Sequence, residues 1–238
     1  MWASRKVGAP GEALEKALAN HAYFKVASGQ LLEAPPDEGQ ALRLVRAYEA
    51  GEAEPWLTAH LLGCIGHDSG YDTVLAILRL SPGALAESYA GVALAKIRGE
   101  AARADLEREL AEGEKRPCRE GAAYGLAELG GEAGGPPVVE AIRKRLIRPQ
   151  MGAVLVDMGL LDSLALDLFE SDSERDRQVA FHAVSSALAR EERATRVPSA
   201  AAKAVLRALE RDRVKASPRI HDIVVEQARE VLRGRNDA

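Results

Sequence analysis

Two histidines, a cysteine and an aspartate lie close together in the sequence, and their side chains are of the types that bind transition metals. His60, Cys64 and His67 are at positions i, i+4 and i+7, which places three potential ligands on one side of a helix end, with Asp68 available as a fourth. The spacing is not a recognised zinc pattern, and the same residues can simply occupy an exposed helix. We therefore expect no metal or other cofactor, and these four residues form the candidate metal site.

A short leucine-led phrase recurs along the chain and indicates the elements that would position these residues. Its copies begin at Leu62, Leu94, Leu126 and Leu155, at intervals of 32, 32 and 29 residues. An interval of this length corresponds to one helical hairpin per repeat. Since neither helix of a hairpin can bury its apolar stripe alone, successive hairpins are expected to stack around a continuous core. The pattern predicts an all-α fold, a right-handed α-solenoid of stacked antiparallel helix pairs.

Alignment of the copies predicts which side chains face solvent. Cys64 aligns with charged residues in the other copies, namely Lys96, Glu128 and Asp157, so its thiol is expected to face outward. His182 aligns with His60 and is likewise expected on the outer face of its helix. Cys118 fills an apolar position of the repeat and is expected in the core.

Prolines, glycines and apolar spacing predict the helix boundaries. Helix starts are expected at prolines, which need no intrahelical N–H bond in the first turn: Pro55, Pro82, Pro117, Pro149 and Pro218. Helix ends are expected at glycines: Gly66, Gly99, Gly130, Gly131 and Gly159. Ser171 and Glu174 have capping-box spacing. The second helix of each pair is expected at residues 71–80, 101–110, 137–146 and 161–169.

The repeat phrase resembles the HEAT repeat of the short bacterial type, also called the phycobilisome-lyase HEAT-like repeat. The family's first helix reads apolar-Arg-x-x-Ala-Ala-x-x-Ala-Leu-Gly, and the matching residues here are Cys118, Arg119, Ala122, Ala123, Leu126, Leu129 and Gly130. The apolar-Arg step recurs at Ile147 and Arg148, and a weaker copy contains Arg177, Ala180, Ala183 and Val184. An arginine recurring at one position can serve a binding site, but in a stacked array it more commonly caps or pairs within the neighbouring repeat.

The resemblance covers residues 55–190 and implies a single solenoid domain over residues 1–238. Residues 1–54 and 191–238 depart from the pattern and are interpreted as divergent helical caps, which solenoids need to cover their outermost apolar faces. Helices are expected within these caps at residues 13–26, 41–48, 200–209 and 220–232.

Members of this family act as scaffolds, as bilin lyases, as iron-dependent hydroxylases or, in a distant branch, as DNA glycosylases. The hydroxylase-like members bind iron through His-Glu pairs, and none of the five histidines here is followed by glutamate. The glycosylase-like members combine a basic groove with aromatic side chains, whereas this chain has a net charge of -4 and two tryptophans. The resemblance therefore implies the fold and leaves the function open.

In this family the second helices generally line the concave surface, so exposed residues there are the predicted partner contacts. By periodicity these are Arg79, Arg103, Glu107, Glu140, Arg143 and Lys144. They carry both signs of charge and include no catalytic triad, phosphate-binding glycine loop or recognisable acid pair. Mixed charge of this kind suits a protein or peptide partner.

The end of the chain is locally basic, with nine basic against four acidic residues between Arg190 and Arg219. A nucleic-acid contact here would use Arg193, Arg196, Lys203, Arg207, Arg211 and Arg213. The segment lacks the interleaved aromatic residues that stack on bases. A solvated face of a capping helix is therefore the favoured interpretation.

Composition bounds the function further. Arg5 and Lys6 are not followed by the apolar run of a signal peptide, and no segment reaches the roughly 18 apolar residues that span a bilayer. Two cysteines form no disulfide framework, and we expect a cytoplasmic protein. We predict a non-enzymatic adaptor, scaffold or inhibitory partner that recognises another polypeptide. The alternatives are a lyase-like or metal-dependent enzyme using the candidate metal site, and nucleic-acid binding through the basic end.

Overall fold

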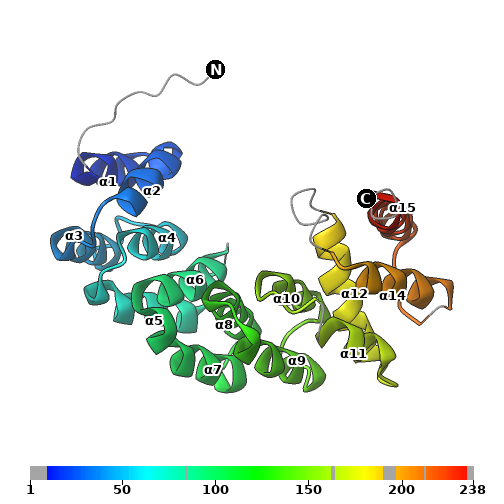
Figure 1. The fold of residues 1–238 in the computed structure, drawn as a ribbon. Coiled ribbons are helices and arrows are strands. Elements are labelled where there is room, and N and C mark those ends of the chain that lie inside the picture. The colour runs from blue at the N-terminus through cyan, green and yellow to red at the C-terminus, as the bar shows by residue number, and fades with distance from the viewer. Residues whose placement is uncertain (1–9, 84, 162–163, 190–196, 212, 235–238) are drawn as a thin grey trace. The chain divides into compact units, whose positions relative to one another are not determined.

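The computed structural model of the chain consists of helices joined by turns and loops (Figure 1). It describes residues 10–83, 85–161, 164–189, 197–211 and 213–234. All regular elements in these ranges are helical, with no strand among them, so the all-α prediction is confirmed. The chain divides into two compact units, Met1–Leu129 and Gly130–Ala238, which we describe separately. A single solenoid domain stays a prediction.

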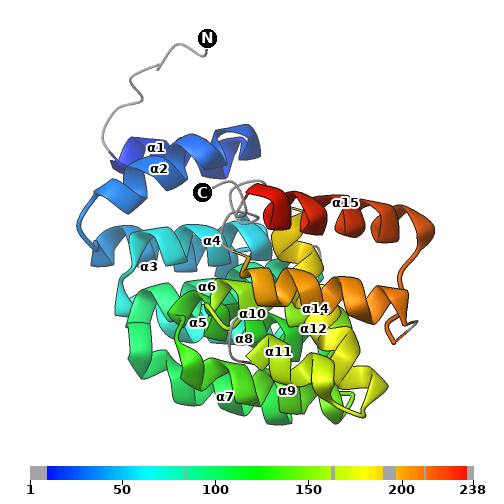
Figure 2. The ribbon, with the colours of Figure 1, turned by 45° about the vertical axis from the view of Figure 1, so that its right-hand side comes forward.

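The first unit contains eight α-helices within its described residues. They are α1 (Pro10–Ala19), α2 (Phe24–Glu33), α3 (Glu38–Glu49), α4 (Pro55–Ile65), α5 (Tyr71–Leu80), α6 (Ala86–Arg98), α7 (Arg103–Glu112) and α8 (Arg116–Leu129). Helices α2, α4, α6 and α8 pack against one another in succession, and α3, α5 and α7 pack against α4, α6 and α8 (Figures 1 and 2). The core between these two rows is aliphatic, with Leu57, Ile77, Leu94, Leu106 and Leu126 fully buried.

Glycines allow α6 and α8 to approach at backbone distance. A Cβ atom built on Gly91 would lie 1.8 Å from the carbonyl oxygen of Gly121, and one on Gly125 would lie 2.5 Å from that of Gly91. Neither position can hold a side chain without separating the two helices. The pair therefore depends on glycine at these points of closest approach.

Polar contacts between neighbouring repeats join residues about one repeat length apart. The Tyr71 hydroxyl donates to Asp105 at 2.8 Å, 34 positions later. The Arg98 guanidinium lies 3.6 Å above the Tyr71 ring and donates to Asp68, 30 positions earlier. Burial and the Asp105 carboxylate raise the pKa of Tyr71 to about 12, so the phenol stays protonated and remains a donor.

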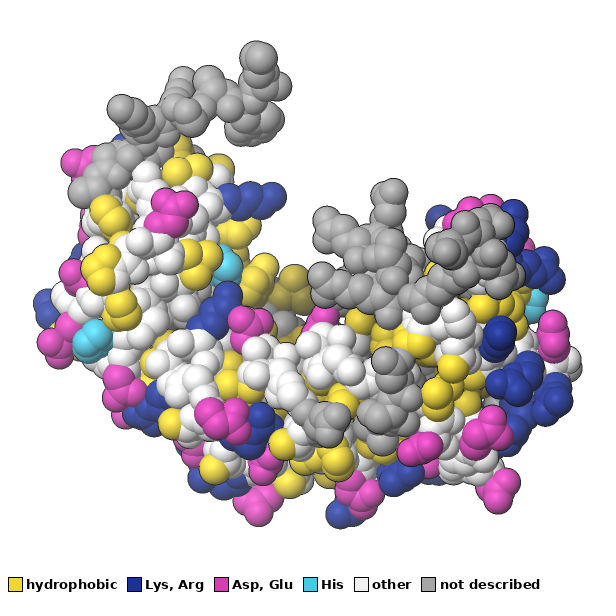
Figure 3. Space-filling view, viewed as in Figure 1, with side chains coloured by type: hydrophobic (Ala, Val, Ile, Leu, Met, Phe, Trp, Pro, Cys, Tyr) yellow, Lys and Arg dark blue, Asp and Glu magenta, His cyan; other side chains and the backbone are white. Residues whose placement is uncertain are grey.

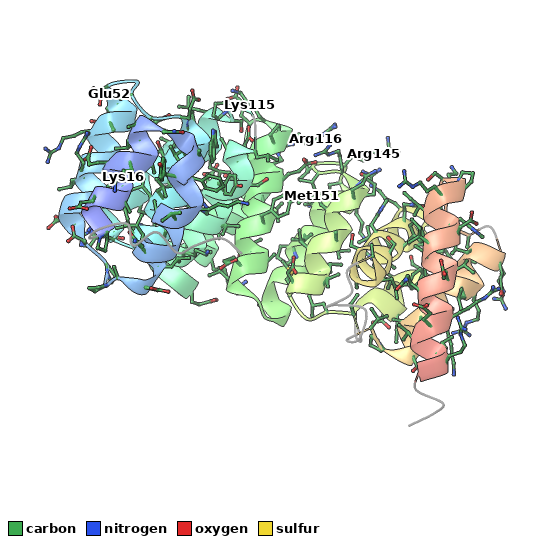
Figure 4. The ribbon with its side chains drawn as sticks, turned by 90° about the horizontal axis from the view of Figure 1, so that it is seen from above. Lys16, Glu52, Lys115, Arg116, Arg145 and Met151 are labelled. Atoms are coloured by element: carbon green, nitrogen blue, oxygen red, sulfur yellow. The ribbon has the colours of Figure 1, made fainter. Side chains whose placement is uncertain are left out.

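Two loops between hairpins lie along one edge of this unit. Figure 4 shows Glu52, in the α3–α4 loop, and Lys115, in the α7–α8 loop, at the same edge. The Lys115 ammonium donates to the Leu80 carbonyl at 2.7 Å and so ties its loop to the end of α5, one repeat earlier.

Several predicted boundaries agree with the first unit. Helix α5 has the predicted bounds Tyr71–Leu80, Pro55 is the first residue of α4, and Gly66 ends α4 in the left-handed conformation with φ of 69°. The start predicted at Pro82 is wrong. Ser81 caps α5 in the left-handed region, and the Glu87 carboxylate accepts from the Gly83 N–H, so α6 begins only at Ala86.

The helical segment predicted at residues 13–26 is helical but is interrupted. Helix α1 ends at Ala19, and a short 3-10 turn at His21–Tyr23 precedes α2. The Asn20 side chain causes the break, because its oxygen accepts from the Ala22 N–H at 3.0 Å and competes with the helical bond.

The second unit is less regular. Its described helices are α9 (Gly135–Arg143), α10 (Val154–Asp157), α11 (Leu164–Glu170), α12 (Glu174–Leu188), α14 (Ser199–Glu210) and α15 (Pro218–Gly234). Helix α10 is a single turn preceded by a 3-10 segment, Pro149–Ala153, so the copy beginning at Leu155 lacks a full first helix. Helices α14 and α15 contact each other and lie side by side (Figure 2).

Helix α12 contains the weaker repeat copy, and its predicted core residues Ala180, Ala183 and Val184 are fully buried. Its start is shifted from the predicted capping box. Ser173, rather than Ser171, caps the helix and accepts from the Asp176 N–H at 3.3 Å. Ser171 instead donates to the Asp176 carboxylate.

Candidate functional site

The four residues of the candidate metal site are not brought together. His67 Nδ1 lies 2.9 Å from the Ser69 hydroxyl, and Asp68 accepts two hydrogen bonds from Arg98. Only His60 and Cys64 approach each other, with 3.9 Å between Nε2 and Sγ. Across the described ranges, no group of three or more His, Cys, Asp or Glu side chains is arranged to hold a metal ion.

The predicted outward orientation of Cys64 is wrong, since its side chain is buried at 5% exposure. Helix α2 packs against α4 and covers this position, whereas the equivalent Lys96 and Glu128 are exposed. Burial raises the pKa of the Cys64 thiol, which makes it a poor nucleophile or metal ligand near neutral pH. His182 is half-buried against Phe181 rather than fully outward.

A hydrogen bond between Ser28 and His60 links α2 to α4. The Ser28 hydroxyl oxygen lies 2.7 Å from His60 Nε2 and 2.7 Å from the Phe24 carbonyl. Because that carbonyl can only accept, we assign the hydroxyl proton to it and a donating Nε2–H to His60. A serine whose proton points away from the imidazole is not activated by it, so this pair joins helices rather than forming a nucleophile and base.

Four rings form a continuous surface across α2, α4 and α6, which we call the aromatic face: Phe24, Trp56, His60 and Tyr89. The Phe24 and Trp56 ring centroids are 5.5 Å apart, and those of Trp56 and Tyr89 are 6.0 Å apart. His60 lies edge-on to Tyr89, with centroids 5.1 Å apart. All four side chains are half-buried, so each ring packs on its neighbours and keeps part of its surface in water.

The aromatic face is uncharged at neutral pH. Burial, together with the nearby Lys96 ammonium, lowers the pKa of His60, which keeps the imidazole neutral. Tyr124 on α8 occupies the position equivalent to His60 two repeats later and is 38% exposed. This face therefore offers apolar rings with polar edges.

The predicted partner contacts on the second helices divide into two groups. Arg79 donates two hydrogen bonds to Glu109, and Arg143 donates two to Asp176. Both acceptor carboxylates are buried, and Arg103 pairs with Glu100. The remaining three balance no buried carboxylate, and their side chains are 41% exposed for Glu107, 52% for Glu140 and 64% for Lys144.

Glu109 is also the partner of Cys118, which is in the core as predicted. The thiol donates to the second Glu109 oxygen at 3.6 Å, and burial with this carboxylate raises the pKa of Cys118 to about 12. These groups border an open pocket of about 310 Å³ beside α7. Arg79 satisfies the buried acid, so the cluster stabilises the contact between α5 and α7.

The recurring arginine has a structural role at Arg177. Its guanidinium donates to the carbonyls of Ser171, Asp172 and Arg213, as expected for an arginine that holds the neighbouring segment. Arg119 is half-buried on α8, one residue after the core thiol.

The basic residues near the chain end are partly assembled. Lys203 and Arg207 are exposed on α14, and Arg211 and Arg213 follow its end. Lys and Arg side chains gather there (Figure 3). Arg193 and Arg196 lie outside the described residues.

Sequence reasoning missed Phe24, Trp56 and Tyr89. Their spacing of 32 and 33 residues is close to the repeat length and was the available signal. The leucine phrase marks the core side of each first helix and does not include these positions.

These observations define an all-α protein in which polar contacts join residues about one repeat length apart in the sequence. No family model, no curated protein and no solved structure matches the chain. No helix in the described ranges is long and apolar enough to cross a membrane.

Proposed function

We propose that this protein is an α-solenoid of HEAT-like helical hairpins whose function is to bind another polypeptide. The aromatic face on α2, α4 and α6 is the proposed contact surface, and it is the observation that carries the proposal. The proposed role is non-enzymatic, as an adaptor, scaffold or inhibitory partner.

The solenoid assignment is supported by the packing of the first unit. Helices α2, α4, α6 and α8 contact one another in succession, and polar contacts such as Arg79 to Glu109 join residues 30 positions apart. An array of this kind presents equivalent positions of successive repeats side by side. A partner segment can therefore extend over several repeats.

The aromatic face supports polypeptide binding for energetic reasons. Trp and Tyr are enriched among the residues that contribute most to protein interfaces, because a large rigid ring buries much apolar area at low entropic cost. Trp56 and Tyr89 already pack on Phe24 and His60, so binding would cost little further ordering. A neutral, ring-rich surface favours apolar segments containing Pro, Leu or aromatic residues.

The charged second-helix residues are less suited to this role. Arg79 and Arg143 balance buried carboxylates, so using them to bind a partner would expose an uncompensated acid. Glu107, Glu140 and Lys144 remain exposed enough to contribute at the rim of an interface. A metal-dependent or lyase-like enzyme would need the candidate metal site, whose residues bind other side chains instead.

Affinity capture from host lysate at low and moderate salt tests the proposal, with protein and nucleic acid both identified. The captured partner is then added in increasing amounts to the Trp2→Phe variant of this chain, in which Trp56 is the only tryptophan. Saturable quenching or a blue shift of Trp56 emission is expected, because the ring loses water on binding.

The test variant combines Trp56→Ser with Tyr89→Ser. The matched variant, the charged-set control, combines Glu107→Gln, Glu140→Gln and Lys144→Gln. Loss of capture only with the aromatic pair supports the proposal, provided that circular dichroism shows both variants folded. Capture lost only with the charged set, or a bound metal or chromophore in place of a protein, would overturn it.

A further inference from the structure

Three arginines of the second unit converge on a small pocket at the end of α14. The pocket has a volume of about 90 Å³ and is bordered by Arg207, Arg211 and Arg213, and Phe169 and Glu170 also line it. The guanidinium groups that line it can donate to a carboxylate or phosphate group.

The local fold holds the third arginine in place. Helix α14 ends at Glu210, and the chain turns back because the Arg213 N–H donates to the Ala208 carbonyl at 2.9 Å. The Arg213 guanidinium then donates to the Ser171 carbonyl at 3.3 Å, and its own carbonyl accepts from Arg177. One of the three side chains is thus fixed before any ligand binds.

The other two arginines have donors available. Arg207 on α14 and Arg211, the residue that follows its end, are both exposed and are four positions apart. Within the part of the chain that the structure describes, neither forms an ion pair with a carboxylate. Lys203, one turn earlier, extends the same basic stripe.

We propose that this pocket binds a carboxylate side chain of an acidic peptide segment. A guanidinium presents paired N–H donors that match the two oxygens of a carboxylate, and both Arg207 and Arg211 border the pocket. The site lies in the second unit and does not involve the aromatic face, so it can fail without affecting the proposed function.

A peptide fits this surface better than a nucleic acid. Glu170 borders the pocket and the exposed Glu210 lies between Arg207 and Arg211 in the sequence, so a continuous run of phosphates would also meet carboxylates. A peptide can place an acidic residue in the pocket and neutral residues beside these glutamates. Phe169, the ring at the pocket, is 3% exposed and cannot stack on a base.

Fluorescence anisotropy on the full chain tests the site, with a labelled peptide of about ten residues in which Glu alternates with Gly and Ala. The variant is Arg207→Gln with Arg211→Gln. The matched control is Arg229→Gln with Arg233→Gln, which removes an equally spaced, exposed pair from α15 and the same charge. A Gln-containing peptide and single-stranded and duplex DNA of similar length complete the set.

We expect the unaltered chain to bind the Glu peptide. The affinity should fall about tenfold in Arg207→Gln with Arg211→Gln and should stay within about twofold of the unaltered value in the α15 control. Equal weakening in both variants would overturn the proposal, because it would indicate charge attraction without a site. Absence of binding to the unaltered chain, or tighter binding of either DNA than of the Glu peptide, would also overturn it. Thermal melts of all variants verify that they are folded.

Discussion

The Nε2 atom of His60 lies 2.7 Å from the Ser28 hydroxyl oxygen and so joins α4 to α2 across one repeat. The bond uses the neutral imidazole as donor, and burial lowers the pKa of His60 below its usual value of about 6.5. The unfolded chain therefore binds the His60 proton at a higher pH than the folded chain does. The neutral His60 imidazole therefore makes its full contribution to folding stability above about pH 6.5. This contribution is lost as the pH falls through the pKa that His60 has in the folded chain.

We predict that the melting temperature of the native chain falls between about pH 7 and pH 5, and falls less in His60→Gln with His182→Gln. Burial also lowers the pKa of His182, so both histidines act in the same direction. Glutamine keeps a side-chain donor for Ser28 and does not titrate. Parallel pH profiles for the two proteins would contradict this assignment.

Asp176 gives a second pH dependence at lower pH. It is 3% exposed, and the Arg143 guanidinium at 2.6 Å holds the pKa of its carboxyl below the usual range. The Asp176 carboxylate contributes to folding stability above about pH 3.9, the usual pKa of an aspartate in an unfolded chain. This contribution is lost as the pH falls through the pKa that Asp176 has in the folded chain. Asp176→Asn should cost about 1–3 kcal/mol at pH 7 and progressively less in acid.

Urea unfolding at pH 7 and pH 3 measures this difference, with Asp167→Asn on an exposed part of α11 as the control. If Asp176→Asn costs the same free energy at both pH values, the Arg143 pairing is not the source of the effect.

The close approach of α6 and α8 predicts an unusual glycine effect. Gly91→Ala places a methyl group against the Gly121 carbonyl and should destabilise the chain by about 1–3 kcal/mol or more. Gly29→Ala on α2 meets no atom within 4 Å and should be neutral or stabilising by up to about 1 kcal/mol. Chemical denaturation of both variants checks the pair, and a neutral Gly91→Ala would show that the helices are further apart.

The core position of the repeat phrase predicts a cavity effect at Leu126, which is fully buried. Leu126→Ala should cost about 2–5 kcal/mol of unfolding free energy. Leu32→Ala, at a side chain that is 56% exposed, should cost well under about 1 kcal/mol. Similar losses for the two would mean that the register of the repeat is misassigned.

The sequence predicts the fold best where a residue's environment depends on its own repeat. Cys118 is buried and α5 has its predicted bounds, because both follow from apolar spacing and from nearby capping residues. Cys64 differs because α2, a helix outside the repeat pattern, covers it. The break at Asn20 depends on one side-chain hydrogen bond that periodicity does not register.

The aromatic face was less predictable because it, too, depends on contacts between different helices. Phe24, Trp56 and Tyr89 come from three different helices, and only stacking of the repeats brings their rings into contact. Likewise, the pairing of Arg79 with Glu109 is what removes that arginine from the predicted contact surface. Spacing within one helix could not reveal either contact.

Selection of a random peptide library on the unaltered chain tests directly whether the aromatic face binds polypeptides. If the aromatic face is the contact surface, the enriched peptides should be rich in Pro, Leu or aromatic residues. They should bind the charged-set control as well as the unaltered chain and should lose binding to Trp56→Ser with Tyr89→Ser. Enriched peptides that bind the aromatic variant as well as the unaltered chain, and fail only on the charged-set control, would show that the aromatic face is not the contact surface.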